Sequence, residues 1–412
     1  MAKKSTKQKK KELNAKGKDV SLYGLVFKTI YTEKQRELIN KSCGCAFLVA
    51  NLYKDWKDKY YEQYKKSISA NEFKFFLANI IKPSEEYKFL NEVDKFALET
   101  AVENMDNGYK NFFEGRSKYP KYKNKHKDKR CYTTKFTNNN IELIKENNKL
   151  YLKLPKLGKL ELISYKNNKI KKILKGSIKI KRVTVTMKNR DIFVSLTLEE
   201  EIDLVTPITE IDKKQITAGD LGIKSLLDLY NGEEHIKIDN YKYLNQSLDK
   251  LKKEQRKLSR MTIGSHNYNK QKEKVNKIYF HIANQRKDYL HKISRMIVNE
   301  NQDYISEDLS ITNMVKNKRL SRQILDCGWG TLDTFIKYKI EEKGGYFIKV
   351  DKFYPSSKTC SCCGYKKIDL NLNIREWDCP QCKAHLDRDS NASENLRNEG
   401  IKILSSMGLA IN

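Results

Sequence analysis

Two Cys-x-x-Cys pairs near the end of the sequence restrict the possible folds of this chain more than any other feature. Cys360 and Cys363 form the first pair, and Cys379 and Cys382 form the second, with 15 residues between the pairs. This spacing is typical of a four-thiolate zinc site, in which each pair supplies two corners of a tetrahedron. Because protein sulfur atoms fill all four positions, we predict one structural zinc ion with no open position for water or substrate.

The other candidate ligands fit a metal site less well. Cys362 is the spare thiol, since only one residue separates it from Cys360. His385 could replace one cysteine, but four thiolates are already present, and a redox-active site would need only one Cys-x-x-Cys pair. Cys43 and Cys45 lie one residue apart within a helical pattern, so we interpret them as packing residues.

The chain carries a large excess of positive charge. Its 412 residues include 82 Lys and Arg against 52 Asp and Glu, a net charge of +30. Such an excess favours nucleic acid or an anionic membrane as a partner. We expect no membrane association, because the apolar runs are too short for a spanning helix and the lysine-rich start is not followed by a signal-peptide core. We therefore predict a cytoplasmic nucleic-acid-binding protein with reduced cysteines.

The first half of the sequence changes its pattern several times. Residues 1–18 are rich in lysine and predict a disordered basic arm. Residues 19–31 predict a strand, and residues 32–114 predict packed helices with apolar positions at Leu38, Cys45, Leu48, Leu52 and Trp56, and at Leu98, Val102, Met105, Tyr109 and Phe112. Strand-like alternation follows residue 137, with a hairpin turning at Asn189 to Asp191. This order predicts a small β-barrel or sheet into which the helices are inserted.

A basic segment separates the predicted helices from the later strands. Residues 115–136 contain nine Lys and Arg against one acid, interleaved with Tyr119, Tyr122 and Tyr132. Basic side chains can neutralise phosphates and tyrosine rings can stack on unpaired bases, although a solvated surface loop is the alternative. From this segment and the basic helical stretch 246–300, we predict nucleic-acid contacts by Arg116, Lys118, Tyr119, Lys121, Tyr122, Lys123, Lys125, Lys129, Arg130, Arg286, Lys287 and Lys292.

Three short acidic motifs lie in the second half of the sequence, which begins near residue 206. Asp220 lies in the strand-like AGDLGIK, Glu307 follows the strand-like NQDYIS, and Asp389 begins a predicted helix, with six residues separating it from Cys382. Taken singly, each acid would be a cap or a salt-bridge partner, and composition alone does not select these three. Between the first two motifs, the helical stretch has apolar residues on one face at Val275, Ile278, Ile282, Leu290, Ile293 and Ile297.

In this order, GDLGIK, EDLS, PSSKTCSCCG, CPQC and DRDSNASENL resemble the nuclease half of the TnpB-type transposon-encoded proteins and the related miniature type V CRISPR effectors. The segments ELINKSCGCAFLVANL, YPKYKNKHKDKRCYTTKFTNNN and HIANQRKDYLHKISRMIV extend the resemblance, which is weakest over 1–18 and 60–95. It implies an α+β multidomain protein. A wedge β-barrel (19–31 and 115–205) is interrupted by a helical recognition lobe (32–114). An RNase H-like (RuvC) α/β nuclease domain (206–351 and 387–412) follows, with a target nucleic-acid-binding zinc ribbon (352–386) inserted in it.

The resemblance also implies a chemistry. By motif position, Asp220, Glu307 and Asp389 would hold two Mg²⁺ ions in a phosphodiester hydrolase, with Asp387 as a neighbour. One departure is that Ala218 and Gly219 precede the first acid, where the family often has Gly-Ile; the acid and the following Leu-Gly are kept. The implied function is RNA-guided cleavage of double-stranded DNA next to a short flanking motif, with one site cutting both strands in turn.

The implied partners are a guide RNA and target double-stranded DNA, bound by a monomer or by a homodimer on one RNA, with nucleoid association when DNA is bound. Within the nuclease interpretation, the transposon-encoded type is favoured and a miniature type V CRISPR effector is the alternative. A non-cleaving RNA-guided repressor or a zinc-ribbon DNA binder would not need all three acids. A transposase that joins DNA ends would also use three acids, but the ribbon and the basic first half are not expected there.

Overall fold

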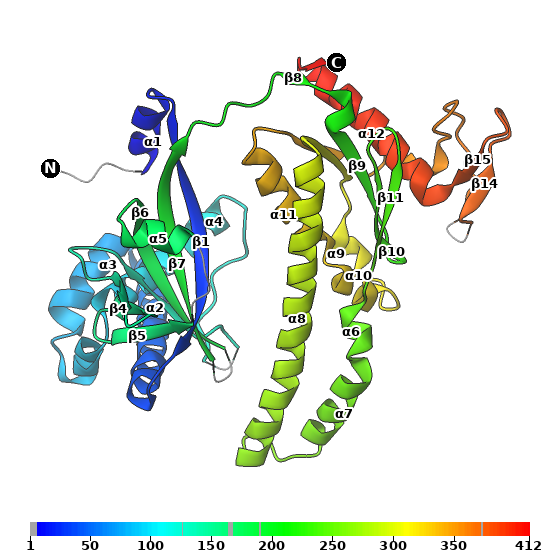
Figure 1. Cartoon of the computed structure of the whole chain (residues 1–412). Coiled ribbons are helices and arrows are strands. Elements are labelled where there is room, and N and C mark those ends of the chain that lie inside the picture. Colours follow the sequence, from blue (N-terminus) through cyan, green and yellow to red (C-terminus); the bar gives the residue numbers. More distant parts are fainter. Residues whose placement is uncertain (1–5, 126, 164–167, 189–190, 372–373) are drawn as a thin grey trace. The chain divides into compact units, whose positions relative to one another are not determined.

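The first half of the chain is built on a seven-stranded antiparallel sheet. The computed structural model describes residues 6–125, 127–163, 168–188, 191–371 and 374–412, and the chain divides into two units, Met1–Leu204 and Val205–Asn412. In the first unit the strand order is β2-β6-β7-β1-β5-β4-β3 (Figure 1). The strands are β1 (Lys18–Ile30), β2 (Cys131–Lys135), β3 (Glu142–Glu146), β4 (Lys149–Leu154), β5 (Gly158–Ile163), β6 (Ile178–Lys188) and β7 (Asp191–Asp203).

Strand β1 lies in the middle of this sheet. It pairs with β7 from Lys18 opposite Asp203 to Lys28 opposite Phe193, and its end pairs with β5. The strand that precedes the helices therefore belongs with the strands that follow them, so the helices are an insertion, as predicted. Among the described strands, no hydrogen-bonded pairing joins β2 to β3, so the sheet that we predicted as a barrel is open in its hydrogen bonding. The predicted hairpin turn falls at 189–190, outside the described residues.

The inserted helices form a core of their own. They are α2 (Glu33–Tyr64), α3 (Ala70–Phe76), the π-helical η1 (Leu77–Ile81), the 3₁₀ helix η2 (Glu85–Glu92) and α4 (Lys95–Phe113). On α4 the predicted stripe is largely confirmed, because Leu98, Val102, Met105 and Tyr109 are buried while Phe112 is half-buried.

The predicted stripe on α2 is displaced. The buried residues there include Ile39, Val49 and Tyr53, whereas Leu48 is half-buried and Trp56 is 37% exposed. Helix α2 contributes to two cores, one against the sheet and one against the other helices. A helix buried on two sides has a wide apolar surface, so a single stripe read from the sequence does not find its centre.

The predicted disordered arm is wrong over its described part. Residues Thr6–Asn14 form α1, and β1 already begins at Lys18. The ammonium group of Lys9 lies 2.7 Å from Glu199 and 3.0 Å from Glu201 at the end of β7. The arm is ordered because acids far along the sequence neutralise its lysines, and local composition does not show such partners. Residues 1–5 lie outside the described residues.

Two further elements of the first unit differ from the predicted pattern. The predicted basic segment ends in β2, where Tyr132 is buried within the sheet core. Helix α5 (Asn168–Leu174) interrupts the run of strands and buries Ile170 and Ile173. Both elements are too short for a periodic pattern to be distinguished from the surrounding lysine-rich sequence.

The second unit is a layered α/β structure. Its five-stranded sheet has the order β11-β10-β9-β12-β13, in which β9, β12 and β13 are parallel and β10 is antiparallel to both of its neighbours, β9 and β11 (Figure 1). The strands are β9 (Ile216–Leu221), β10 (Ser225–Tyr230), β11 (His235–Asp239), β12 (Asp303–Glu307) and β13 (Phe347–Val350). Tyr304 packs with α8 (His266–Glu300) and α11 (Trp329–Glu341), whereas the next residue, Ile305, packs with α12 (Arg388–Ser406). Because successive strand side chains face opposite sides, helices cover both faces of the sheet.

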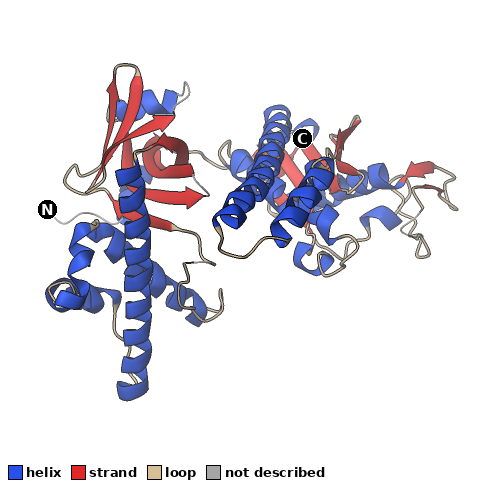
Figure 2. Ribbon diagram, turned by 90° about the horizontal axis from the view of Figure 1, so that it is seen from below, coloured by secondary structure: helices blue, strands red, loops and turns tan. Residues whose placement is uncertain are grey.

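The rest of the second unit consists mainly of helices and loops, with a few short strands (Figure 2). The basic stretch predicted at 246–300 is two helices, α7 (Leu248–Ser259) and α8, and Val275, Ile282, Leu290 and Ile297 of the predicted face are buried. No described helix combines the length and apolar character that a membrane crossing requires. The other elements are β8 (Glu210–Ile211), η3 (Lys213–Gln215), α6 (Tyr243–Gln246), α9 (Ile311–Met314), α10 (Ser321–Cys327), η4 (Ser356–Lys358), β14 (Glu376–Asp378), β15 (His385–Asp387) and β16 (Ala410–Ile411).

Gly400 sets how closely α12 approaches the sheet, which leads to a first prediction. A β-carbon at Gly400 would lie 2.2 Å from Cδ1 of Ile305. Gly400→Ala should lower the free energy of unfolding by about 1–3 kcal/mol, because the overpacking outweighs the gain of roughly 1 kcal/mol in helix propensity. Urea denaturation measures this change.

Gly44→Ala is the matched control for that substitution. Gly44 also lies within a helix, and no atom lies within 4 Å of the position of its β-carbon. The control should therefore gain up to roughly 1 kcal/mol in stability. Equal or greater resistance of the Gly400 variant to urea, relative to the unsubstituted protein, would contradict close packing between α12 and β12.

Candidate active site and zinc cluster

Two of the three predicted acids lie at the same edge of the second sheet. Asp220 is near the end of β9, and Glu307 is the last residue of β12. The two strands are parallel neighbours, and their register places Gly219 opposite Ser306, directly before the two acids. Adjacent strands lie about 5 Å apart, so this register brings the two carboxyl groups side by side. By alternation, both acids face α12, on the same side as Ile305.

The third acid comes from α12. Asp389 lies in the first turn of this helix, and the side chain of Asp387 caps the helix by accepting hydrogen bonds from the backbone N–H groups of Asp389 (3.1 Å) and Ser390 (3.0 Å). The capping explains why two nearby acids differ in role. Asp387 accepts hydrogen bonds from the first backbone N–H groups of the helix, whereas the carboxylate of Asp389 is the one available to the sheet. The choice of Asp389 over Asp387 as a site residue remains a prediction.

The electrostatics show that the acids lie close enough to act on one another. Burial is the largest cause that raises the pKa of Asp220 to about 8, and the negative charges of Glu307, Asp389 and Asp228 contribute to this rise in that order. Burial also raises the pKa of Glu307. A cluster of carboxyl groups that resists ionisation needs positive charge, and hard carboxylate oxygens are the ligands that Mg²⁺ prefers. The chemistry of these side chains therefore suits a divalent cation, although among the described residues only the four cysteines have ligand atoms already gathered closely enough to hold a metal ion.

A side chain of the ribbon already contacts this cluster. One guanidinium nitrogen of Arg375 lies 3.2 Å from Oδ1 and 3.3 Å from Oδ2 of Asp389. Arg375 directly precedes β14, whose partner strand β15 leads into α12. Sequence reasoning missed this contact, because no motif distinguishes Arg375 from the other basic residues of the ribbon.

The packing around Gly219 explains the departure from the family pattern before the first acid. A β-carbon at Gly219 would lie 2.2 Å from the hydroxyl oxygen of Tyr304 and 2.7 Å from Cδ1 of Leu227. The Tyr304 ring therefore occupies the space that a larger residue at position 219 would need. The departure is compensated by a bulky neighbour on β12, and the position of Asp220 at the end of β9 is kept.

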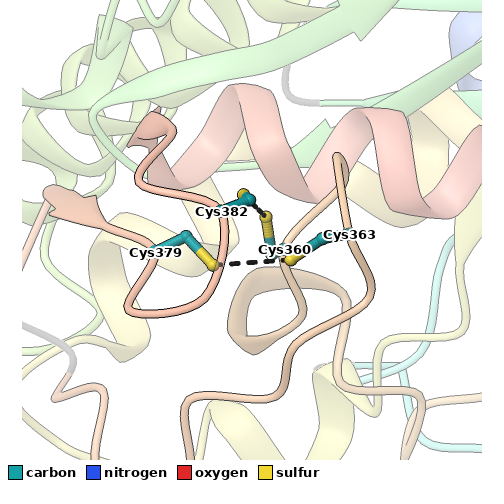
Figure 3. Close-up of side chains that lie close together, drawn as sticks. All are labelled: Cys360, Cys363, Cys379 and Cys382. Carbon is teal, nitrogen blue, oxygen red and sulfur yellow. Dashed lines mark hydrogen bonds between the residues drawn. The ribbon is translucent and has the colours of Figure 1, made fainter.

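The four predicted zinc ligands lie together. The sulfur atoms of Cys360, Cys363, Cys379 and Cys382 all lie within 4.8 Å of one another, and Figure 3 shows the two pairs facing each other. The shortest approaches are 3.5 Å between Cys363 and Cys379 and 3.7 Å between Cys360 and Cys382. This cluster fits a structural zinc ion.

Both cysteine pairs use the same backbone turn. Gly364 follows the first pair with φ +79° and Lys383 follows the second with φ +63°, and each backbone N–H donates to the carbonyl of the first cysteine of its pair at 2.9 Å. Cys362 is exposed and lies outside the cluster. His385 is also not a ligand of this cluster, since its Nδ1 lies 2.8 Å from a carboxylate oxygen of Asp378.

The basic segment of the first unit is held against α2 by its backbone. The backbone of Lys123 exchanges two hydrogen bonds with the side chain of Asn51, at 2.7 and 3.0 Å. No described carboxylate pairs with Lys121 or Lys125. The predicted contact residues Lys118, Lys121, Lys123, Lys125, Lys129 and Arg130 are exposed, and Arg116 pairs with Glu114. The structure thus presents a row of cations on an ordered backbone.

The tyrosines of this segment already make contacts within the protein. Tyr132, which is not among the predicted contact residues, is buried in the sheet core and cannot stack on a base. The hydroxyl of Tyr119 donates to Asp58 at 2.7 Å, and the ammonium group of Lys54 lies 4.7 Å from the Tyr119 ring and 4.8 Å from the Tyr122 ring. Both of these rings remain substantially exposed.

The predicted contacts on α8 divide into two kinds. Arg286 donates to the side chain of Asp326 (3.2 Å) and to the carbonyl of Leu325 (3.0 Å), so it attaches α10 to α8 and is not a free cation. Lys287 and Lys292 are exposed, and Lys292 pairs with Asp288 on the same helix at 2.7 Å. Only the latter two lysines are available on the surface.

Two family models match the segments that contain the three acids and the four cysteines. A family model described as "Probable transposase" matches residues 195–318, which include Asp220 and Glu307. A second model, described as "Cas12f1-like, TNB domain", matches residues 329–396, which include the four cysteines and Asp389. A cryo-electron microscopy structure of a Cas12f1–sgRNA–target DNA complex matches the chain with a TM-score of 0.53 and 14% identity, covering 92% of this chain and 99% of that one, which shows a shared fold.

Two curated relatives match over most of their length. An RNA-guided DNA endonuclease of Streptomyces pristinaespiralis is 32% identical over 379 residues, covering 90% of this chain and 87% of the relative. The RNA-guided DNA endonuclease InsQ of Escherichia coli (strain K12) is 26% identical over 340 residues, covering 79% of each chain. The chain therefore belongs to the TnpB-type family, whose curated members carry the name RNA-guided DNA endonuclease.

Proposed function

We propose that the protein is an RNA-guided endonuclease that hydrolyses double-stranded DNA at the site formed by Asp220, Glu307 and Asp389. The observation that carries this proposal is the convergence of the three acids, from two neighbouring parallel strands and the first turn of α12, on one face of the sheet. In this site Asp220 and Glu307 hold cations at the sheet edge and Asp389 completes the ligand set from the helix. Two Mg²⁺ ions, when bound, supply the charge that stabilises the attacking and leaving oxygens of the phosphodiester.

The fold of each unit supports finer assignments. The order β11-β10-β9-β12-β13, in which β10 is antiparallel to both of its neighbours, supports an RNase H-like (RuvC) nuclease domain that comprises residues 206–351 and 387–412. In the first unit, the seven-stranded sheet corresponds to the wedge and the inserted helices to the recognition lobe. The four-cysteine region, residues 352–386, would be the zinc ribbon that contacts target nucleic acid, and the contact of its Arg375 with Asp389 supports its placement beside the proposed nuclease site.

The charge of the chain suits this division of labour. A guide RNA and its DNA target present many phosphates, and base pairing by the guide supplies the sequence specificity, so the protein needs mainly cations and shape. One acidic site in a basic protein admits one strand at a time, so the two strands are cut in turn. The protein acts as a monomer or as a homodimer on one RNA, in the cytoplasm and on nucleoid DNA. The match of residues 195–318 to the model described as "Probable transposase" supports the transposon-encoded type over a miniature type V CRISPR effector.

Removing the buried acid tests the nuclease assignment. Asp220→Ala should lower the rate of target cleavage by roughly a thousandfold or more, because metal ions contribute several kcal/mol to the transition state. Guided binding of target DNA should remain, which separates loss of chemistry from loss of the complex. Cleavage of a target plasmid by the purified protein–RNA complex in Mg²⁺ measures the rate.

Asp239→Ala is the matched control, because Asp239 is an exposed acid at the end of β11 in the same sheet. It should cleave like the unsubstituted protein. Full cleavage by the Asp220 variant would contradict the metal-site assignment and would favour a different set of acids.

The zinc site gives a second test. Cys379→Ser should reduce bound zinc from about one ion per chain to near none and should lower solubility, because binding to a structural site contributes directly to folding. Cys362→Ser is the control, since this exposed thiol lies outside the cluster. Elemental analysis of both variants decides the question: similar zinc contents would show that Cys379 is not a ligand.

The basic segment gives a third test. Replacing Lys121, Lys123 and Lys125 together by Glu should weaken guide-RNA binding and reduce the slope of log affinity against log salt by roughly two to three. Replacing Lys149, Lys159 and Lys172 is the control for the change of charge, because these lysines pair with described acids elsewhere in the unit. Unchanged affinity and slope for the first variant would remove the segment from the RNA-binding surface.

A further inference from the structure

A fourth acid lies directly beside the candidate site. Asp228 is on β10, and the antiparallel register places it opposite Asp220 on β9. Opposed residues of neighbouring strands share a face, so Asp228 also points towards α12. Its side chain is 1% exposed, and an aspartate buried within the apolar run SLLDLY needs partners.

The partners of Asp228 come from the helix that carries Asp389. Ser390 Oγ lies 3.3 Å from Oδ2 of Asp228, and Ser393 Oγ lies 3.4 Å from Oδ1. These serines follow Asp389 in the first two turns of α12. Both carboxylate oxygens of Asp228 therefore accept contacts from the start of this helix.

Two cations of β11 complete the connection. His235 Nδ1 lies 3.4 Å from Asp228 and its Nε2 lies 2.9 Å from Glu394 of α12. The ammonium group of Lys237 lies 3.0 Å from the capping residue Asp387 and 3.7 Å from Asp228. Hydrogen bonds to Asp228 and Glu394 raise the pKa of His235 to about 9, so it is a cation at neutral pH. We name Asp228, His235 and Lys237 the hairpin clamp.

The hairpin clamp contacts residues of α12 and its cap that lie before and after the catalytic acid in the sequence. Asp387 precedes Asp389, and Ser390, Ser393 and Glu394 follow it. The oxygens of Asp228 are already occupied by two serines and two cations, so this carboxylate is not a further cation ligand of the kind proposed for its neighbours. Its contacts instead join the strand next to Asp220 to the helix turn that bears Asp389.

We propose that Asp228 is a positioning residue of the nuclease site, which sets the distance between Asp220 and Asp389 by clamping the first turns of α12 to the β10–β11 hairpin. This inference rests on the proposed function for its catalytic consequence, but the clamp itself is a property of the metal-free protein. Residues that orient metal ligands typically change metal affinity or activity by about 10- to 100-fold when they are lost.

Asp228→Asn tests the clamp, because the amide keeps the shape but cannot balance two cations. Asp303→Asn is the matched control: Asp303 is an equally buried acid at the opposite end of β12, where it accepts from the backbone N–H of Tyr346. The first measurement is hydrogen–deuterium exchange of residues 387–396 in the metal-free full chain. The second is the Mg²⁺ concentration that gives half-maximal target cleavage by the protein–RNA complex.

In the Asp228 variant we expect faster exchange at 387–396 and a Mg²⁺ half-saturation raised by about tenfold. In the Asp303 variant we expect both quantities to match the unsubstituted protein, even if its melting temperature falls. An Asp228 variant that matches the control in both measurements would overturn the proposal. So would slower cleavage with an unchanged Mg²⁺ half-saturation and unchanged exchange, which would assign Asp228 to stability alone.

A second variant covers the case in which Asp228→Asn does not fold. His235→Gln alters a half-buried side chain and removes the bridge between Asp228 and Glu394, so it should shift both measurements in the same direction by a smaller factor. Unchanged exchange and Mg²⁺ dependence in this variant would overturn the clamp. If the unsubstituted complex cleaves no target, the proposed function fails, while the exchange comparison in the metal-free chain still decides whether the clamp exists.

Discussion

The parallel pairing of β9 with β12 is the constraint on which the rest of the second unit depends. Its register brings Asp220 and Glu307, 87 positions apart in the sequence, to one edge of the sheet. Two such acids repel each other, and burial makes their ionisation still less favourable. The backbone hydrogen bonds and the apolar cores on both faces hold them together despite this repulsion. The fold itself therefore brings these two acids together, which is the arrangement expected if they belong to the preorganised metal site proposed above.

Hydrogen bonds connect the four-cysteine region directly to α12. Among its described residues, the four-cysteine region has a small apolar core that contains Leu370, Trp377 and Leu386, so a zinc ion at the cysteines would supply stability that apolar burial does not. The backbone carbonyl of Thr359, next to Cys360, accepts from the side-chain amides of Asn391 (2.7 Å) and Asn395 (2.6 Å) on α12. The start of the helix is thus attached to the ribbon on one side and to the β10–β11 hairpin on the other. Asp389 lies between these two attachments.

Sequence patterns were most informative where the chemistry depends on short spacing. The four cysteines could be chosen from their separation alone, and the structure confirms that they lie together. The three acids could be chosen only through the family resemblance, because nothing local distinguishes Asp220 from other acids at strand ends. Asp228 was missed, although a charged residue inside the apolar run SLLDLY is a signal that a buried partner exists. Arg375 carried no such signal, since its role depends on how the ribbon folds back onto α12.

The failures have a shared physical cause. The N-terminal arm is helical because Lys9 meets Glu199 and Glu201, and Tyr132 is buried because β2 joins the edge of a sheet. Both outcomes depend on residues far away in the sequence, whereas composition reports only local preference. The apolar stripe on α2 was misplaced for the same reason. This helix packs against both the sheet and the other helices, and the local sequence does not show those contacts. Long-range pairing therefore decided each of these elements.

The position of β1 has a consequence for biosynthesis. This strand is made first, yet the register that pairs Lys18 with Asp203 requires β7, the last strand of the unit to leave the ribosome. During translation β1 must therefore remain unpaired along most of its length while the helices, whose core is formed by residues close in the sequence, can already pack. A nascent chain stalled before residue 190 would therefore leave this strand unpaired and exposed, and the exposed strand would be a site for chaperone binding.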